Sequence, residues 1–189
     1  MPDPTAPLRG GDSLPRIAHG VVLRRLSPSD LRAFQAYRHD AVLGQYQGWS
    51  ATPDVEANAF LTEMSSAALL QPGVWCQLAI AQPGDLALVG DIGLLLAPDG
   101  RHSEIGFTLR RQSQGRGIAT NAAREAISMV FERTGAERVL GITDVRNLPS
   151  IRVLERVGMH KVESRSVIFR GEPCVEYIYA VSRDRDGGQ

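Results

Sequence analysis

The stretch RRQSQGRGIATNAAREA, residues 110–126, places two glycines directly before a helical pattern. Small and apolar residues recur at helical spacing from Ala119 to Phe131, which predicts a long amphipathic helix. The preceding segment, EIGFTLR at 104–110, alternates like a strand. Because the first N–H groups of a helix lack intrahelical partners and carry partial positive charge, this junction predicts an anion site.

Two common phosphate-binding motifs do not match this loop. A Walker motif needs Lys followed by Ser or Thr after its second glycine, and the loop has neither. A Rossmann motif has three glycines, in the pattern G-x-G-x-x-G, directly after the first strand of its domain. Here Gly115-x-Gly117 supplies only two glycines, and several predicted strands precede them. Arg116 can add a charge-assisted contact to an anion. Taken alone, the loop is also compatible with a purely structural turn.

The order of several motifs resembles the GNAT N-acetyltransferases. Gln112-x-x-Gly115-x-Gly117 is similar to that family's acetyl-coenzyme A loop, and NLPSIRVLERVG at 147–158 is similar to its asparagine-containing helix. SEIGFTL at 103–109, LRRLSPSDL at 23–31 and YQGW at 46–49 resemble the branch that acetylates N-terminal amines of ribosomal proteins. The resemblance runs from about residue 21 to residue 181.

The pattern of elements along the chain is strand, two helices, three strands, helix, strand, helix and two strands. The resemblance implies a mixed α/β GNAT fold, with a mostly antiparallel seven-stranded sheet flanked by about four helices. We expect one domain over residues 17–182, between flexible tails at 1–16 and 183–189.

The resemblance also implies roles for individual residues. Glu104 is the expected base, acting through water, and also contacts the acceptor. Ser150 is the expected acid, because Leu154 stands where many members carry a tyrosine. Tyr46 and Trp49 are the expected acceptor contacts. The residues expected to bind acetyl-coenzyme A are Thr108, Leu109, Arg110, Gln112, Gln114, Gly115, Arg116, Gly117, Ile118, Ala119, Asn147 and Ser150.

Three functions remain open from the sequence. The first is acetylation of a protein N-terminus, and the second is acetylation of a small amine such as an antibiotic, a polyamine or an amino-acid derivative. The third is a coenzyme-binding module without catalysis, which the absent tyrosine leaves open. Val167 or a neighbour stands where the ribosomal branch carries a further glutamate, which leaves the acceptor undecided.

Composition bounds the remaining classes. Lys and Arg together number 21, as do Asp and Glu, so zero net charge argues against a generally basic nucleic-acid-binding surface. No apolar run approaches the roughly 20 residues of a membrane span. Cys76, Cys174 and the four histidines show no metal-ligand spacing. We expect a cytoplasmic protein without metal, with an exposed edge in its last hairpin that can support a homodimer.

Overall fold

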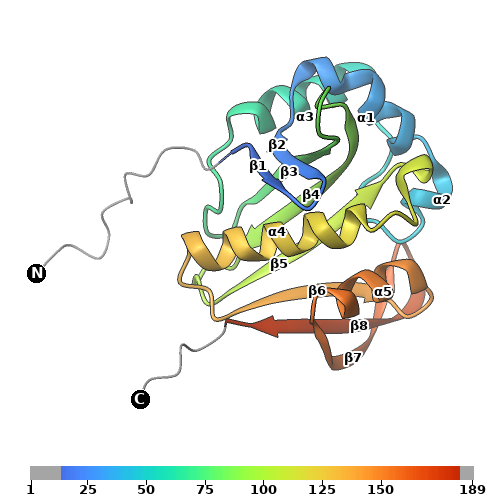
Figure 1. Cartoon of the computed structure of the whole chain (residues 1–189). Helices are drawn as coiled ribbons and strands as arrows, with labels where there is room; N and C mark the ends of the chain where they lie inside the picture. The colour runs from blue at the N-terminus through green and yellow to red at the C-terminus, as the bar shows by residue number, and fades with distance from the viewer. Residues whose placement is uncertain (1–13, 184–189) are drawn as a thin grey trace, which may run out of the picture.

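An eight-stranded sheet runs through the described part of the chain, residues 14–183 of this computed structural model (Figure 1). Its strand order is β1-β2-β3-β4-β5-β6-β8-β7. Neighbouring strands are antiparallel except β5 and β6, which are parallel. The strands are β1 (Arg16–Ala18), β2 (Val21–Arg25), β3 (Trp75–Ala81), β4 (Leu88–Leu96), β5 (His102–Leu109), β6 (Arg138–Asp144), β7 (His160–Phe169) and β8 (Glu172–Ser182).

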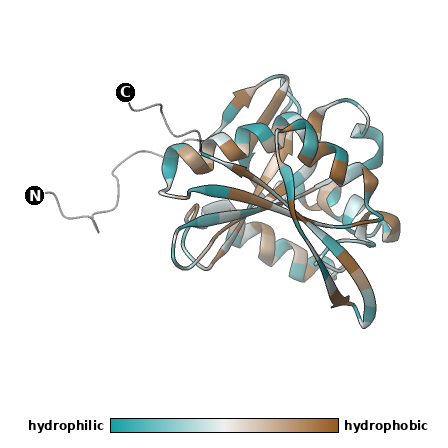
Figure 2. Cartoon of the chain, turned by 90° about the horizontal axis from the view of Figure 1, so that it is seen from below, coloured by the Kyte–Doolittle hydropathy of each residue, from teal (hydrophilic) through white to brown (hydrophobic). Residues whose placement is uncertain are grey.

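Helices cover both faces of the sheet. On one face α4 and α5 close the larger apolar core, and on the other α1 and α3 close a smaller core over β3 and β4. Hydrophobic and hydrophilic residues alternate along the helices (Figure 2), and in α4 most of the apolar residues are buried. None of the described helices is long and apolar enough to cross a membrane. The helices are α1 (Leu31–Arg38), α2 (Ala41–Gly44), α3 (Asp54–Ser66), α4 (Ile118–Arg133) and α5 (Leu148–Arg156), with 3-10 turns η1 (Pro28–Asp30) and η2 (Arg111–Ser113).

Helix α4 confirms the periodicity found in the sequence. Ala122, Ala123, Ala126 and Val130 are fully buried against the sheet. These small side chains let the helix axis lie close to the strands, so that the loop before α4 is held tightly against the end of β5.

The mixed α/β GNAT-like architecture is confirmed, but the sheet has eight strands rather than seven. The additional strand is β1, which begins at Arg16 inside the expected N-terminal tail. It has only three residues, and Ile17 is 72% exposed, so it shows no usable periodicity. At the other end, the Arg183 guanidinium donates to the carbonyls of Phe131, Thr134 and Ala136. The rest of the two expected tails, 1–13 and 184–189, lies outside the described residues.

Arg16 attaches β1 to α4. Its guanidinium lies 2.5 Å from the Glu125 carboxylate and 2.8 Å from that of Glu132, and its side chain is only 16% exposed. We expect Arg16→Ala to lower the free energy of unfolding by about 1 kcal/mol, because partly buried pairs exceed the small value of surface pairs. For a chain of this size that is a fall in Tm of roughly 2–4 °C. In calorimetry, Arg101→Ala is the matched control, since its 3.6 Å pair with Glu137 is exposed. Equal shifts in the two variants would contradict this role.

The parallel strands β5 and β6 diverge along their length (Figure 1). They pair only from His102 with Arg138 to Ile105 with Gly141, although both continue for several residues. The Arg110 N–H donates to the Val89 carbonyl on β4. Because ladder bonds alternate along a strand, the N–H and C=O groups of Phe107 and Leu109 point away from β4 and into the opening. We call this opening the β5–β6 gap.

Candidate active site

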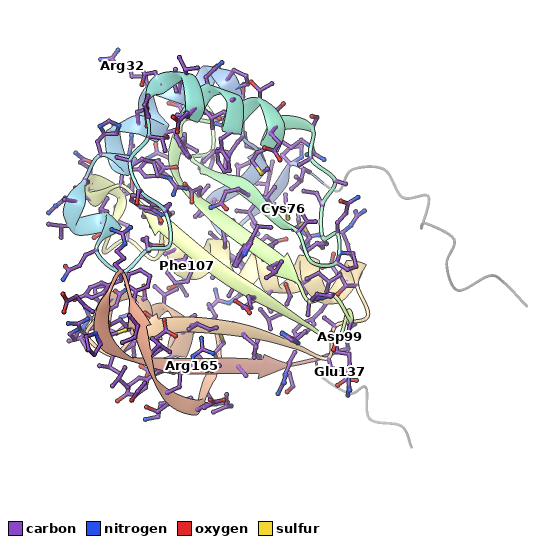
Figure 3. The ribbon with its side chains drawn as sticks, turned by 180° about the vertical axis from the view of Figure 1, so that it is seen from behind. Arg32, Cys76, Asp99, Phe107, Glu137 and Arg165 are labelled. Carbon is purple, nitrogen blue, oxygen red and sulfur yellow. The ribbon has the colours of Figure 1, made fainter. Side chains whose placement is uncertain are left out.

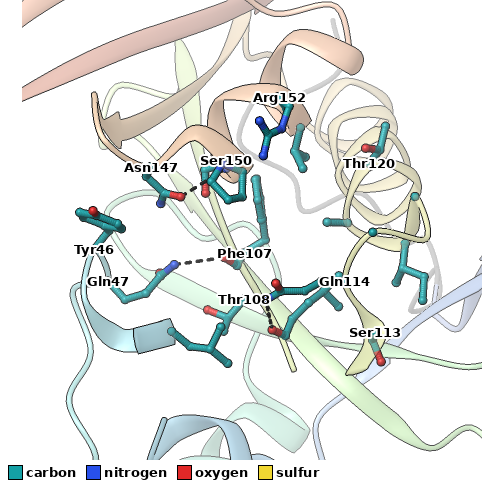
Figure 4. Close-up of a pocket in the computed structure, with 18 of the residues that line it drawn as sticks. Tyr46, Gln47, Phe107, Thr108, Ser113, Gln114, Thr120, Asn147, Ser150 and Arg152 are labelled. Atoms are coloured by element: carbon teal, nitrogen blue, oxygen red, sulfur yellow. Dashed lines mark hydrogen bonds between the residues drawn. The ribbon is translucent and has the colours of Figure 1, made fainter. Parts of the chain in front are cut away.

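A cavity of about 420 Å³ lies at the β5–β6 gap (Figure 4). Four segments that are distant in sequence line it: α2 with the chain directly after it, the end of β5, the loop into α4, and α5. The lining residues are Val42, Leu43, Gln45, Tyr46, Gln47, Phe107, Thr108, Leu109, Ser113, Gln114, Gly115, Gly117, Ile118, Ala119, Thr120, Asn147, Pro149, Ser150, Arg152, Val153 and Arg156.

The loop into α4 exposes backbone N–H groups to this cavity. Gly115 and Gly117 have φ of +73° and +76°, a conformation that side chains with a Cβ rarely adopt, and no atom lies within 4 Å of a Cβ built on either. The first helical bond runs from the Asn121 N–H to the Gly117 carbonyl at 3.0 Å. Within the described residues, the N–H groups of Gly115 through Ala119 have no protein acceptor, so they can bind an anion.

The backbone at the end of β5 presents donors to the same cavity. The carbonyl of Leu109 accepts from the Gln114 side chain at 3.0 Å, and that of Phe107 accepts from Gln47 at 3.4 Å. In an extended strand the N–H of a residue points to the same side as its C=O. The Leu109 N–H therefore faces the cavity, where it can stabilise negative charge on a carbonyl oxygen.

Helix α5 contributes a polar first turn. The side-chain oxygen of Asn147 caps the helix by accepting from the Ser150 N–H at 3.3 Å (Figure 4). The side-chain NH2 of Asn147 makes no hydrogen bond within residues 14–183, so it remains free to donate into the cavity. Leu154, at the usual position of the tyrosine, is 2% exposed in the main core and does not line the cavity. Ser150 is the hydroxyl at the cavity on this helix.

An ion pair ties α2 to the loop into α4. Asp40 caps α2 by accepting from the N–H groups of Val42 and Leu43, and it accepts from Arg111 Nη2 at 2.6 Å. The Arg111 guanidinium, together with the two N–H groups, lowers the Asp40 pKa from 3.8 to about 2. The pair therefore joins two walls of the cavity.

The Asp40 pKa gives a pH dependence with a defined sign. Because folding lowers this pKa, its contribution to stability is complete above about pH 4 and is lost as pH falls toward 2. Asp40→Asn keeps an N-cap side chain and removes the charge. We expect the Tm difference between natural protein and variant to be constant above pH 5 and to shrink toward zero near pH 2. A difference independent of pH in a calorimetric series would contradict the ion pair.

The structure brings together most of the residues that the sequence nominated. Ten of them line the cavity: Tyr46, Thr108, Leu109, Gln114, Gly115, Gly117, Ile118, Ala119, Asn147 and Ser150. Five do not: Trp49, Glu104, Arg110, Gln112 and Arg116.

The residues outside the cavity lie in three kinds of place. Trp49 lies behind Thr108 and donates to its Oγ1 at 3.3 Å. Arg110 donates from Nε to Ser113 Oγ at 3.0 Å, while Gln112 and Arg116 are exposed. Glu104 lies in the paired part of β5, opposite Leu140, and its side chain is on the other face of the sheet from Ile105.

Sequence reasoning missed several lining residues. Arg152 and Arg156 on α5 are exposed at the cavity, where a guanidinium can bind a phosphate. Their spacing of four residues, which puts both on one side of the recognised helix, is a signal that could have found them. Gln47 is adjacent to a nominated residue, but nothing in the sequence shows that its amide reaches Phe107.

Comparisons with known proteins agree with this geometry. The family described as "Acetyltransferase (GNAT) domain" matches residues 21–160. The uncharacterized N-acetyltransferase YoaA of Bacillus subtilis is 25% identical over 170 residues, covering 88% of this chain and 95% of YoaA. A GNAT acetyltransferase structure from Bacillus anthracis superposes with a TM-score of 0.78 at 21% identity, over 88% of this chain and 96% of that one. RimL, a ribosomal L7/L12 alpha-N-protein acetyltransferase solved with coenzyme A, superposes with a TM-score of 0.77 at 20% identity, over 91% and 99%.

Proposed function

The chain belongs to the GNAT family of acetyl-coenzyme A-dependent N-acetyltransferases, and we propose that its acceptor is the N-terminal amine of a protein or peptide. Acetyl transfer from acetyl-coenzyme A to an amine is the activity of this family. The identity of the acceptor and the roles of individual residues are proposed from the contacts around the cavity.

The proposed donor site uses the exposed N–H groups of the loop. Gly115 to Ala119 would hold the pyrophosphate of acetyl-coenzyme A, with Arg152 and Arg156 available to other phosphate oxygens. The free amide of Asn147 would donate to the pantetheine arm. The thioester would then lie in the β5–β6 gap, with its carbonyl oxygen accepting from the Leu109 N–H.

One contact favours a chain terminus as acceptor. Arg170, in the turn between β7 and β8, donates to the carbonyls of Gln47 at 3.1 Å and Trp49 at 2.5 Å. The hairpin tip, which extends the β6 side of the gap, therefore meets the 45–50 loop, which packs on β5 (Figure 3). Because the contact between the hairpin tip and the 45–50 loop crosses the β5–β6 gap, the acceptor does not enter along an open groove. It enters beside this contact. The end of an extended peptide fits such an entrance better than a lysine on a folded surface.

In this scheme proton transfer involves two further side chains. The acceptor nitrogen bonds to the thioester carbon, the carbon–sulfur bond breaks, and Ser150 gives its proton to the leaving thiolate. Glu104 takes the proton of the amine and releases it to water, and water returns a proton to Ser150. Phe107 is three positions after Glu104 on β5, about 10 Å along the strand, so this transfer runs through water.

Glu104→Gln tests the base. We expect kcat to fall about 100-fold, the lower range for general base catalysis, with no change in the Kd of acetyl-coenzyme A. The rate is measured by thiol release and the Kd by calorimetry. Parallel losses in kcat and coenzyme affinity would show that Glu104 supports the fold of the site instead.

The acceptor is tested with three probes under identical conditions. The first is a peptide beginning with alanine and containing one lysine, the second is that peptide with a blocked N-terminus, and the third is spermidine. We expect acetylation of the first probe at its terminal amine, located by tandem mass spectrometry, and little reaction with the others. Preferred acetylation of the blocked peptide or of spermidine would overturn the proposal in favour of a lysine or small-amine acceptor.

The compartment and assembly are also proposals. Cys76 and Cys174 are both free thiols, which is consistent with the cytoplasm. Strand β7 is the last strand of the sheet, and Val162 and Ile168 on it are 59% and 69% exposed. A second copy of the chain pairing along this edge would cover them, which light scattering of the purified protein can detect.

A further inference from the structure

A buried ionic cluster lies beneath α1, outside the cavity. The carboxylate of Asp91 on β4 is 1% exposed and accepts three hydrogen bonds. The donors are the Tyr37 hydroxyl at 2.5 Å, Arg38 Nη2 at 2.7 Å and Gln77 Nε2 at 2.7 Å. Burial raises the pKa of Tyr37 well above its usual value, and the Asp91 charge adds to this shift, so Tyr37 keeps its proton and donates.

Stability alone does not account for this cluster. Desolvating two charges costs as much as their attraction returns, and apolar side chains of similar size often serve equally well. The Arg38 side chain is 6% exposed and its Nε has no hydrogen-bond partner within the described residues, so the pair is incompletely compensated. Phe34 and Tyr37, on the same helix as Arg38, both belong to the smaller apolar core.

The cluster does, however, reach the site through an aromatic ring. The Arg38 guanidinium carbon lies 4.4 Å from the centre of the Trp49 ring and 4.6 Å from that of Phe34. A guanidinium at this distance from an indole ring is favourable and fixes how the two groups lie relative to each other. The same indole donates from Nε1 to Thr108 Oγ1 at 3.3 Å.

Thr108 connects the buried ionic cluster to the β5–β6 gap. It lies between Phe107 and Leu109, whose backbone groups face the β5–β6 gap, and it is paired directly with Asp91 in the β4–β5 ladder. Trp49 also belongs to the 45–50 loop that meets Arg170. Arg38 thus contacts the ring of Trp49, while Arg170 contacts the backbone carbonyl of the same residue.

We propose that Arg38 and Asp91 are positioning residues, which fix Trp49 against Thr108 and so hold the 45–50 loop in the place that admits the acceptor amine. The inference rests on the proposed function, because it takes that loop as the acceptor wall. It assigns the ion pair to acceptor affinity and not to binding of acetyl-coenzyme A.

The test measures Trp49 and the acceptor separately. The chain has two tryptophans, so Trp75→Phe leaves Trp49 as the sole indole. In that background Arg38→Met should reduce the near-ultraviolet circular dichroism of Trp49. With the alanine-initiated peptide, its acceptor KM should rise about tenfold, in line with a small misplacement of a binding wall. The Kd of acetyl-coenzyme A should not change.

Two comparisons separate positioning from loss of stability. Arg24→Met breaks another largely buried ion pair, in which Arg24 lies 2.8 Å from Asp30. This variant should lower Tm without changing the acceptor KM. If Arg38 acts through Trp49, Arg38→Met should raise the acceptor KM much less in a Trp49→Phe protein than in the natural one.

Each outcome has a distinct meaning. An unchanged Trp49 signal, an unchanged acceptor KM, or a parallel loss of acetyl-coenzyme A affinity would overturn the positioning role. If the natural protein acetylates spermidine but not the peptide, the proposed acceptor fails, and the same KM comparison is made with spermidine. If it turns over none of the three probes, the Trp49 signal still decides whether the pair fixes the ring.

Discussion

Gly117→Glu is expected to weaken binding of acetyl-coenzyme A at least 100-fold while the protein remains folded. Gly117 has a φ of +76°, directly precedes α4 and lines the cavity, in the loop whose N–H groups lack protein acceptors within the described residues. Glutamate is strained in this conformation, and its carboxylate would repel the pyrophosphate where the helix dipole should attract it. Calorimetric titration measures the Kd, and thermal unfolding of the same sample checks the fold.

Two matched variants isolate the cause. Gly117→Asn adds bulk without charge in a conformation that asparagine tolerates, and should retain most of the affinity. Gly100→Glu introduces the same residue at a φ of +70° in the turn between β4 and β5, at the opposite end of β5 from the cavity, and should bind normally. Equal weakening by Gly100→Glu would mean that general destabilisation, not the loop, explains the loss.

Gly90→Ala is expected to cost about 3 kcal/mol of unfolding free energy and to abolish turnover. A Cβ at Gly90 would lie 2.1 Å from the Thr108 backbone oxygen and 2.8 Å from a Leu109 methyl group. Since the first of these is backbone, β5 itself must move, and overpacking that moves a central strand lies at the upper end of such penalties. The displaced segment carries the Leu109 N–H, so chemistry should fail together with stability.

Gly106→Ala is the control for that substitution. Gly106 is on β5, the strand that pairs with the strand of Gly90, but a Cβ there meets no atom within 4 Å and its φ is not positive. We expect a change within about 0.5 kcal/mol, as for other unobstructed positions. Urea unfolding of both variants tests the contrast, and similar losses in the two would contradict the close approach of β4 and β5.

Local patterns accounted for the parts of the fold that depend on neighbouring residues. The alternation before Leu109, the two glycines and the period from Ala119 onward are all contained in about 30 residues, and they predicted β5, the loop and α4. Asn147 likewise showed the start of α5 by its cap spacing. Short elements were not predicted, because the three residues of β1 and the four of α2 are too few to show a hydrophobic periodicity.

Contacts between distant residues could not be predicted in the same way. Arg38 and Asp91 are 53 positions apart, and Arg170 and Trp49 are 121 apart. Hydrophobic periodicity does not reveal contacts between such distant residues. The sequence therefore predicted Trp49 as part of the acceptor pocket, but not that its ring lies behind Thr108. Arg152 and Arg156 were overlooked for a different reason, since exposed arginines on a helix are common on any surface.

Amide chemical-shift mapping of the isotopically labelled protein with acetyl-coenzyme A is the most direct test of whether the coenzyme lies in the cavity between β5, α4 and α5. We predict the largest shifts at the N–H groups of Gly115 to Ala119 and of Leu109, with small shifts at a separate hollow beside Lys161 and Tyr177. Shifts concentrated at Lys161 and Tyr177, with the glycine loop unaffected, would contradict this placement of the coenzyme.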